Sequence, residues 1–280
     1  MLHKLLDEIS RLRIQAQDDD AGKIEDVYFD DQTWCLRYFV VNTGSWLWGR
    51  RVLISPLAVE KPDWAQHVLR VKLTREQVKN SPDIDLERPV SQQQLVELHQ
   101  YYGWPMFWDV DPMLGASIVG TYPVAWAPRQ EAAGEPAQTK NRAAQSVEAP
   151  ADQKPADRHL RSAHEVKSYH IHATDGEFGH VEDFFASEAD WIVRYLLIDS
   201  HRWLPGRKFL IAPDWIDSIN WSEAEVKITL TRQRIQHSPE YIPDQAIQRD
   251  YESKLYRYYE APGYWVGKPD STPASQAKHE

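Results

Sequence analysis

Paired carboxylates occur twice in this chain of 280 residues, and their chemistry is the first to need an explanation. Glu25–Asp26 and Glu182–Asp183 each follow a glycine at the same spacing. General acid–base catalysis needs two carboxylates in different environments that converge on one substrate. Neighbouring residues of a strand point to opposite faces of a sheet, so these pairs do not converge. We therefore predict a structural role for them and no catalytic residue.

Four arginines occupy matching places in the two halves of the chain. A guanidinium group can hold a carboxylate or phosphate through two parallel hydrogen bonds. Because acids of the same half lie nearby, we favour internal ion pairs over capture of a ligand. One acid of each carboxylate pair is expected either to accept hydrogen bonds at a turn or to bind Arg37 or Arg194. The four are Arg37, Arg194, Arg50 and Arg207.

Three histidines of the second half form the best metal candidate in the sequence. His170 and His172 lie two residues apart and would share one face of a strand, while His180 belongs to the next predicted strand. Neutral imidazole is a good ligand for zinc and copper. The matching positions of the first half hold no histidine, and the sequence identifies no complete ligand set. We favour a solvated strand face and expect no bound metal.

Aromatic residues gather at the end of each half, in a Tyr-Tyr-x-x-Pro-x-aromatic-Trp pattern. Such residues can form a protein-binding surface or stack on RNA bases. The first segment contains no Lys or Arg, which argues against RNA. We favour packing against the same half or across a contact between halves, with a partner-binding patch as the alternative. That patch would consist of Tyr101, Tyr102, Trp104, Trp108, Tyr258, Tyr259 and Trp265.

Composition weighs against several function classes. The formal net charge of −10 disfavours nonspecific binding to nucleic acid or anionic lipid. Cys35 is the only cysteine, so no disulfide can form within one chain. We find no secretory signal and no apolar stretch long enough to span a bilayer, and we expect a cytoplasmic protein. Phosphate-loop, Cys-x-x-Cys and nucleophile-elbow motifs are missing, so we expect neither an enzyme nor a cofactor.

The two halves are copies of one another. Residues 14–108 align without a gap with residues 171–265, at an offset of 157 positions. A residue that the scaffold needs should recur in both copies, whereas special chemistry can occupy one copy alone. The recurring residues include Gly22/Gly179, Trp34/Trp191, Tyr38/Tyr195, Gly49/Gly206 and Pro56/Pro213.

A segment of different composition separates the copies. Residues 127–158 are rich in alanine and proline and contain no aromatic residue. Such a segment buries too little apolar surface to offset the entropy lost on ordering, so we predict a disordered linker. Residues 269–280 resemble it and are predicted to be a disordered tail. The predicted domains are residues 1–126 and 159–268.

Each copy has the pattern of short strands followed by a helix. In the first copy the strands are expected near 13–16, 24–29, 34–42, 52–54, 57–60 and 68–73. A helical turn follows Thr74, and a helix capped by Ser91 is predicted over 91–102, with its counterpart over 244–259. Several short strands in so short a segment favour a small closed or nearly closed β-barrel, because closure removes exposed edges. The predicted fold class is mainly β, with two small barrels, each followed by a short helix and an aromatic C-terminal segment.

The order of motifs resembles the PRC-barrel superfamily, named for the cytoplasmic domain of the photosynthetic reaction centre H subunit. The resemblance rests on Gly-x-(Ile/Val)-Glu-Asp, then Trp-x-(Leu/Val)-Arg-Tyr, then Trp-Leu-x-Gly-Arg-(Arg/Lys)-x-Leu-Ile-x-Pro. It covers residues 14–78 and 171–235, and the whole chain resembles tandem PRC-barrel proteins of bacteria. The family implies barrel domains that steady a membrane complex or assist assembly of the small ribosomal subunit, and neither role is enzymatic.

These observations lead to a functional expectation. Repetition without a catalytic constellation favours a noncatalytic adaptor or assembly module that binds another macromolecule, most simply a protein. The two barrels would either dock as a pseudo-twofold pair or act bivalently, and homo-oligomers would use the same surfaces. One alternative is a small-molecule or metal-binding sensor related to stress. Another is a factor for assembly of the ribosome, of RNA complexes or of a photosynthetic complex.

Overall fold

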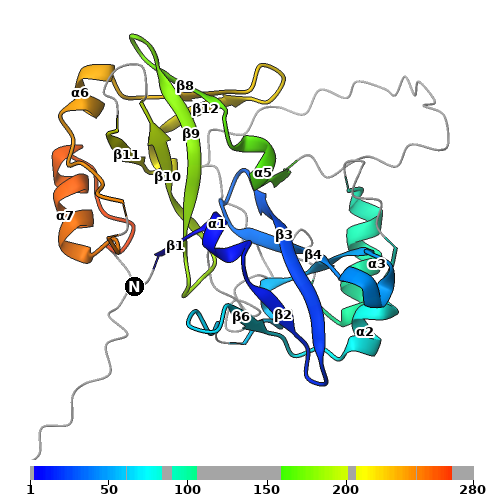
Figure 1. Cartoon of the computed structure of the whole chain (residues 1–280). Helices are drawn as coiled ribbons and strands as arrows, with labels where there is room; N and C mark the ends of the chain where they lie inside the picture. Colours follow the sequence, from blue (N-terminus) through cyan, green and yellow to red (C-terminus); the bar gives the residue numbers. More distant parts are fainter. Residues whose placement is uncertain are drawn as a thin grey trace, which may run out of the picture.

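The computed structural model describes residues 3–60, 62–83, 90–105, 159–200, 206–243 and 245–266. They form two separate mixed sheets, each built mainly by one copy, and the helices that follow each sheet in the sequence lie on the outer sides (Figure 1). The predicted linker and tail, residues 127–158 and 269–280, lie outside the described residues and stay predictions. The mainly β character of the fold is confirmed.

The sheet of the first copy has the strand order β5-β4-β3-β2-β6, in which β2 and β6 are parallel and the other neighbours antiparallel. Two 3-10 turns and two α-helices complete this copy. The elements are β2 (Arg13–Gln15), β3 (Asp20–Asp30), β4 (Leu36–Asn42), η1 (Gly44–Leu47), β5 (Arg51–Ile54), η2 (Pro56–Ala58), β6 (Val68–Arg70), α2 (Arg75–Lys79) and α3 (Gln92–Tyr102).

The sheet of the second copy repeats this order as β11-β10-β9-β8-β13, with β12 added beyond β13. The pair of β8 and β13 is again parallel. The elements are β8 (His170–Ala173), β9 (Gly176–Ser187), β10 (Val193–Asp199), β11 (Lys208–Ile211), η4 (Pro213–Trp215), β12 (Ile216–Asn220), β13 (Glu225–Ile228), α6 (Arg232–Gln236) and α7 (Arg249–Tyr258).

Neither sheet closes into a barrel within the described residues, which corrects the expectation of closed barrels. In the first copy, β5 and β6 lie at opposite ends of the strand order and do not pair with one another, and the chain between them passes through η2, which starts with Pro56. Proline cannot donate a ladder hydrogen bond. In the second copy, Trp215 of η4 packs against Tyr256 and Tyr259 of the C-terminal helix region.

Two of the predicted helix starts are confirmed, and one is wrong. Thr74 and Ser91 cap α2 and α3 with their side chains, each accepting from a backbone N–H three residues on. The last helix begins at Arg249 and not at 244, because the chain before it runs as a loop that buries Ile247 in the core. Its N-cap, Gln248, offers no side-chain hydrogen bond.

The recurring glycine in the long strand has a steric explanation. A Cβ at Gly22 would lie 2.1 Å from the carbonyl oxygen of Asn42, and one at Gly179 would lie 2.1 Å from that of Asp199. Any side chain would therefore push the neighbouring strand away. Both copies need glycine here because β3 and β9 each approach the next strand too closely for a larger residue.

The copies exchange their N-terminal arms. The first arm, β1 (His3–Leu5) and α1 (Leu6–Ile9), precedes the first copy, yet β1 pairs with β9 of the second. The second arm, β7 (Leu160–Ser162) and α5 (Ala163–Val166), pairs in return with β3 of the first. The registers match, since His3 lies opposite Ser187 and Leu160 opposite Asp30. The two short helices lie between the lobes (Figure 1).

One apolar core runs through both copies. A single cluster of buried side chains contains residues of the first sheet, of the second sheet and of both arms. Phe29 contacts Phe184 across the two copies with ring centroids 5.8 Å apart, and Phe39 meets Trp191 edge to face at 5.2 Å. Because the sheets share this core, neither copy can separate without exposing apolar surface to water.

Candidate functional site

The paired acids hold the exchanged arms. Asp26 accepts a hydrogen bond from the backbone N–H of His164, at 3.1 Å, and another from the Ser162 hydroxyl, both in the second arm. Asp183 accepts from the backbone N–H of Asp7, at 3.2 Å, in the first arm. Burial raises the pKa of both aspartates, although these hydrogen bonds and nearby cations oppose the shift. The recurring aspartate is therefore a cap that each copy supplies to the other's helix.

The glutamate of each pair faces the other way, as the alternation of a strand predicts. Glu25 binds Arg51 with an N–O distance of 2.8 Å, and Glu182 binds Lys208 at 2.5 Å. Neither Arg37 nor Arg194 binds one of these acids, which was one of the two expected alternatives, but the favoured internal ion pairs of both arginines are confirmed. Arg37 instead binds Asp30 at 3.2 Å, and Arg194 binds Asp190, because both arginines project toward the turn that joins the two long strands.

Arg50 and Arg207 join the sheet to the helical turn of their own copy. Arg50 donates to the carbonyl oxygens of Lys79 and Ser81, at 2.8 and 2.7 Å. Arg207 donates to the carbonyl oxygen of Gln236 and forms an ion pair with Glu240 at 3.1 Å. The prediction of internal contacts is confirmed for both, and cations that bind helix-terminal carbonyls also favour the helix dipole.

A seam joins the copies at residues 34–36 and 191–193. Leu36 donates its N–H to the carbonyl oxygen of Trp191, and Val193 donates to that of Trp34, both at 2.8 Å. The two tryptophans have φ values of 60° and 54°, in the left-handed region that non-glycine residues rarely adopt. Each such residue costs about 1–3 kcal/mol, which the paired backbone bonds and the packing of the buried Trp34 and the partly buried Trp191 offset.

The structure does not bring the three histidines together as metal ligands. His170 lies 3.2 Å from a Glu177 oxygen, His172 lies 3.3 Å from one of Glu225, and His180 is the strand neighbour of His170. No group of three His, Cys, Asp or Glu side chains placed to hold a metal ion occurs among the described residues. The histidines therefore line a partly exposed strand surface.

Most of the aromatic candidates pack within their own copy. Tyr102 stacks on Trp104 at 4.2 Å, Tyr259 lies buried against Trp215, and Trp265 contacts Tyr256 at 5.1 Å. Trp108 lies outside the described residues.

The hydroxyls of two matching tyrosines bind the helical turn of their copy. Tyr101 donates to the carbonyl oxygen of Gln77, and Tyr258 donates to that of Arg234, at 2.9 and 2.8 Å. Tyr101 is the most exposed of the described candidates, at 40%. These contacts give the aromatic segments a role in packing and leave little of their ring surface for a partner.

A buried polar cluster ties the first arm to the second copy, and sequence reasoning missed it. Glu252 accepts from the hydroxyls of Tyr195 and Tyr264 at 2.9 and 2.8 Å, and its carboxylate lies 3.0 Å from His3. Arg249 binds the second carboxylate oxygen at 3.0 Å. Burial alone would raise the pKa of Glu252, but its hydrogen bonds with His3 and the two tyrosines hold that pKa below the ordinary value.

The first copy has an apolar cluster at the corresponding place. Leu160 of the second arm packs against a group that includes Tyr38 and Leu95. An offset of 157 relates Leu160 to His3 and Leu95 to Glu252. The sequence feature that could have predicted the cluster is a pair of positions that are both apolar in one copy and both ionisable in the other.

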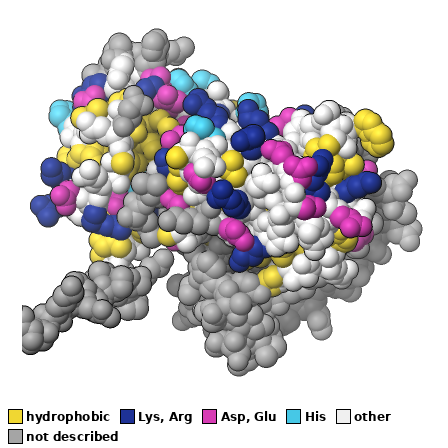
Figure 2. Space-filling model, turned by 60° about the horizontal axis from the view of Figure 1, so that its bottom comes forward, with side chains coloured by type: hydrophobic (Ala, Val, Ile, Leu, Met, Phe, Trp, Pro, Cys, Tyr) yellow, Lys and Arg dark blue, Asp and Glu magenta, His cyan; other side chains and the backbone are white. Residues whose placement is uncertain are grey.

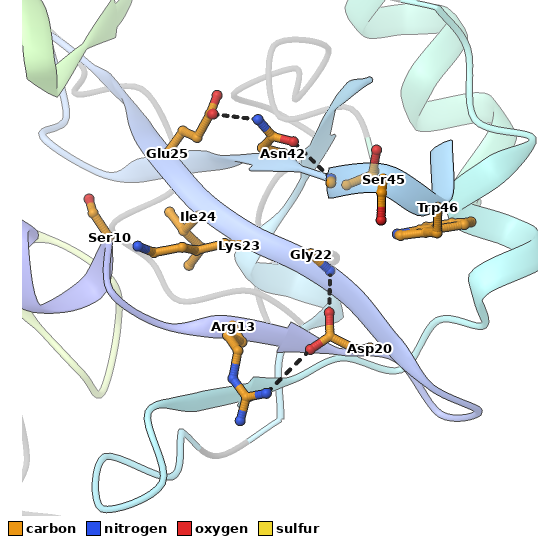
Figure 3. A pocket seen from close by; sticks show the side chains of 12 residues that line it. Ser10, Arg13, Asp20, Gly22, Lys23, Ile24, Glu25, Asn42, Ser45 and Trp46 are labelled. Atoms are coloured by element: carbon orange, nitrogen blue, oxygen red, sulfur yellow. Dashed lines mark hydrogen bonds and ion pairs between the residues drawn. The ribbon is translucent and has the colours of Figure 1, made fainter. Parts of the chain in front are cut away.

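An open pocket of about 700 Å³ lies beside the first copy's long strand. Its walls come from β2, β3, the turn around η1 and the end of the first arm (Figure 3). Lys23 projects toward Ser10 at one end, and Trp46 lies at the other end. Arg13 borders the pocket 3.7 Å from Asp20. Sequence reasoning did not single out this pocket, whose residues come from segments that only the fold brings together.

Comparison with known protein families gives a match for the part of the chain that contains the first sheet. Residues 4–78 match the family model of the PRC-barrel domain, and this part of the chain is one PRC-barrel domain. Residues 160–228, which contain the strands of the second copy, have no such match. No curated protein matches the chain. None of the helices in the described ranges has both the length and the apolar character that a membrane crossing requires.

Proposed function

We propose that the second sheet is a PRC-barrel-type domain like the first and that the chain is a noncatalytic adaptor or assembly module for another protein. The reciprocal exchange of arms is the observation that carries this proposal. It holds two related domains at a fixed separation, so that equivalent surfaces on α2–α3 and α6–α7 face outward on opposite sides (Figure 1). A rigid body of this kind suits the positioning of partners.

Surface charge supports a protein partner over a nucleic acid. On the face drawn in Figure 2, Lys and Arg side chains lie interspersed with Asp and Glu. Binding to a phosphate backbone needs a continuous, positively charged surface patch. The cytoplasm remains the proposed compartment, since Cys35 is buried and, as the single cysteine of the sequence, cannot form a disulfide within one chain.

Affinity purification of the full chain from its source cell, with identification and reconstitution of the captured protein, tests the proposal. We expect a stoichiometric complex that withstands nuclease treatment. A protease site placed in residues 127–158 provides the control, because a docked scaffold keeps its partner after cleavage whereas a flexible bivalent binder loses avidity. Capture of RNA alone, or turnover of a substrate by the purified chain, contradicts the adaptor role.

A further inference from the structure

We propose that the pocket beside β3 binds a small organic anion, with a carboxylate or phosphate group at Lys23 and a planar body beside Trp46. This site is independent of the proposed adaptor role. Three observations carry it: the charges along the strand pair, an indole N–H without an acceptor, and the shape of the pocket.

The charge argument starts from the strand register. Arg13 lies directly opposite Lys23 in the antiparallel pair of β2 and β3. Like charges at opposed positions destabilise a sheet. Arg13 is partly compensated by Asp20, and the remaining pocket acid, Glu25, is held by Arg51 at 2.8 Å. Within the described ranges Lys23 forms no ion pair, so the ammonium group is the cation that a bound anion would neutralise.

The second observation concerns Trp46. The guanidinium of Arg75 lies over its ring, 4.1 Å from the ring centroid. The indole Nε1 is buried and has no hydrogen-bond acceptor among the residues that the structure describes. A buried donor that stays unpaired is unfavourable, and it calls for an acceptor nearby. A ligand that enters this end of the pocket with a small movement of the ring can supply one.

The shape of the pocket sets the class of ligand. Lys23 and Trp46 lie at opposite ends, so a ligand that meets both must be elongated (Figure 3). A volume of about 700 Å³ suits a small molecule and not a folded partner. Ser45 adds a hydroxyl near the tryptophan. An aromatic or heterocyclic ring that carries an anionic group fits all of these features.

Titration of the isotope-labelled full chain, followed by NMR, tests the site with phenyl phosphate and benzoate as probes. We expect saturable chemical-shift changes of the backbone amides of Gly22, Lys23 and Gly44. One indole N–H signal should shift as well, and Trp46→Phe should remove that signal. The probe that binds with the higher affinity identifies the preferred anionic group, phosphate or carboxylate. Inorganic phosphate, which lacks the planar body, is expected to bind more weakly than phenyl phosphate.

Lys23→Gln is the decisive variant, because the side chain is exposed and its loss should not disturb the fold. We expect it to weaken binding roughly tenfold, as loss of a charge-assisted hydrogen bond predicts. His180→Gln is the matched control, since His180 occupies the equivalent position of the second copy, and it should leave binding unchanged. The proposal is overturned if neither probe gives saturable shifts up to about 10 mM, or if Lys23→Gln binds as tightly as the natural chain.

Discussion

Cys35 and Ile192 lie opposite one another as an antiparallel bridge between the two copies. They are also the same position of the duplicated sequence, since 157 residues separate them. A residue meets its own counterpart only on a twofold axis, so a local pseudo-twofold axis passes between them. The flanking bonds, from Leu36 to Trp191 and from Val193 to Trp34, obey the same symmetry. The contact between the copies is thus that of a symmetric dimer whose two members share one chain.

Ile192→Cys should form a disulfide with Cys35. The flanking hydrogen bonds make the two residues a non-hydrogen-bonded pair, whose Cα atoms typically lie about 4.5 Å apart. This separation is within the range that disulfides span. Burial raises the pKa of Cys35 to about 11, so oxidation will be slow at neutral pH and needs an added oxidant. After cleavage within residues 127–158, the halves should migrate together on a non-reducing gel and separate when reduced.

Cys35→Ser combined with Ile192→Cys is the control for that experiment, because it keeps the new thiol and removes its partner. Halves that separate under oxidising conditions in the single variant, despite full consumption of thiols, would falsify the pseudo-twofold contact.

Asp26→Ala should weaken the hold of the first copy on the second arm. The substitution leaves the His164 N–H and the Ser162 hydroxyl without their acceptor. Loss of a helix cap costs about 1–2 kcal/mol, and we expect that decrease in the free energy of unfolding. Hydrogen exchange should show faster opening of residues 160–166 than of residues 3–9. Asp183→Ala should produce the reverse pattern, and equal exchange of both arms in both variants contradicts this role.

The sequence allowed prediction of the sheets but not of their connection. The pattern of apolar and β-branched residues between turn residues predicted the main strands, and Thr74 and Ser91 indicated the starts of two helices. Closure of the barrels could not be judged, since it depends on how the turn at Pro56 directs the chain. The exchange of arms was missed because β1 and β7 have three residues each, too few for a periodic signal. Sequence spacing could not place His3 beside Glu252, which only the exchange brings together.

Stability should rise with pH between about 4 and 6.5 because of His99. Burial lowers the pKa of this imidazole to about 4, and its nitrogens bind the Tyr38 hydroxyl and the Pro105 carbonyl oxygen. In this window the unfolded chain takes up a proton that the folded chain does not, so acid favours unfolding. A pKa shift of this size changes the free energy of unfolding by about 3 kcal/mol across the window.

His99→Gln removes the titrating group and provides the comparison. The variant is less stable than the natural chain at pH 7, but denaturant titrations should show the difference shrinking as the pH falls toward 4. Other groups titrate in both proteins and cancel in this difference. Parallel stability curves across the window would mean that the folded state binds the His99 proton as readily as the unfolded state does.

His3→Leu and Glu252→Leu together should cost less stability than the two single changes added. Either single change takes one partner away from a buried polar group, and a buried polar group that loses a hydrogen bond typically costs about 1–3 kcal/mol. The double change copies the apolar pair Leu160 and Leu95 that the first copy uses at the same place. The double change removes both sides of this contact together, so the loss of the contact is counted once and the four proteins of the cycle should show a coupling above about 1 kcal/mol.

The same cycle can reveal why one copy keeps an ionic contact. We expect the difference to assign each arm to one sheet, because a histidine arm can bind Glu252 whereas a leucine arm suits the apolar cluster around Leu95. If it does, the double variant, though stable, should lose this distinction and form dimers in which first copies of two chains pair. Light scattering measures this directly. A double variant that stays monomeric wherever the natural chain does, at every concentration tested, shows that the ion pair adds stability without directing the arms.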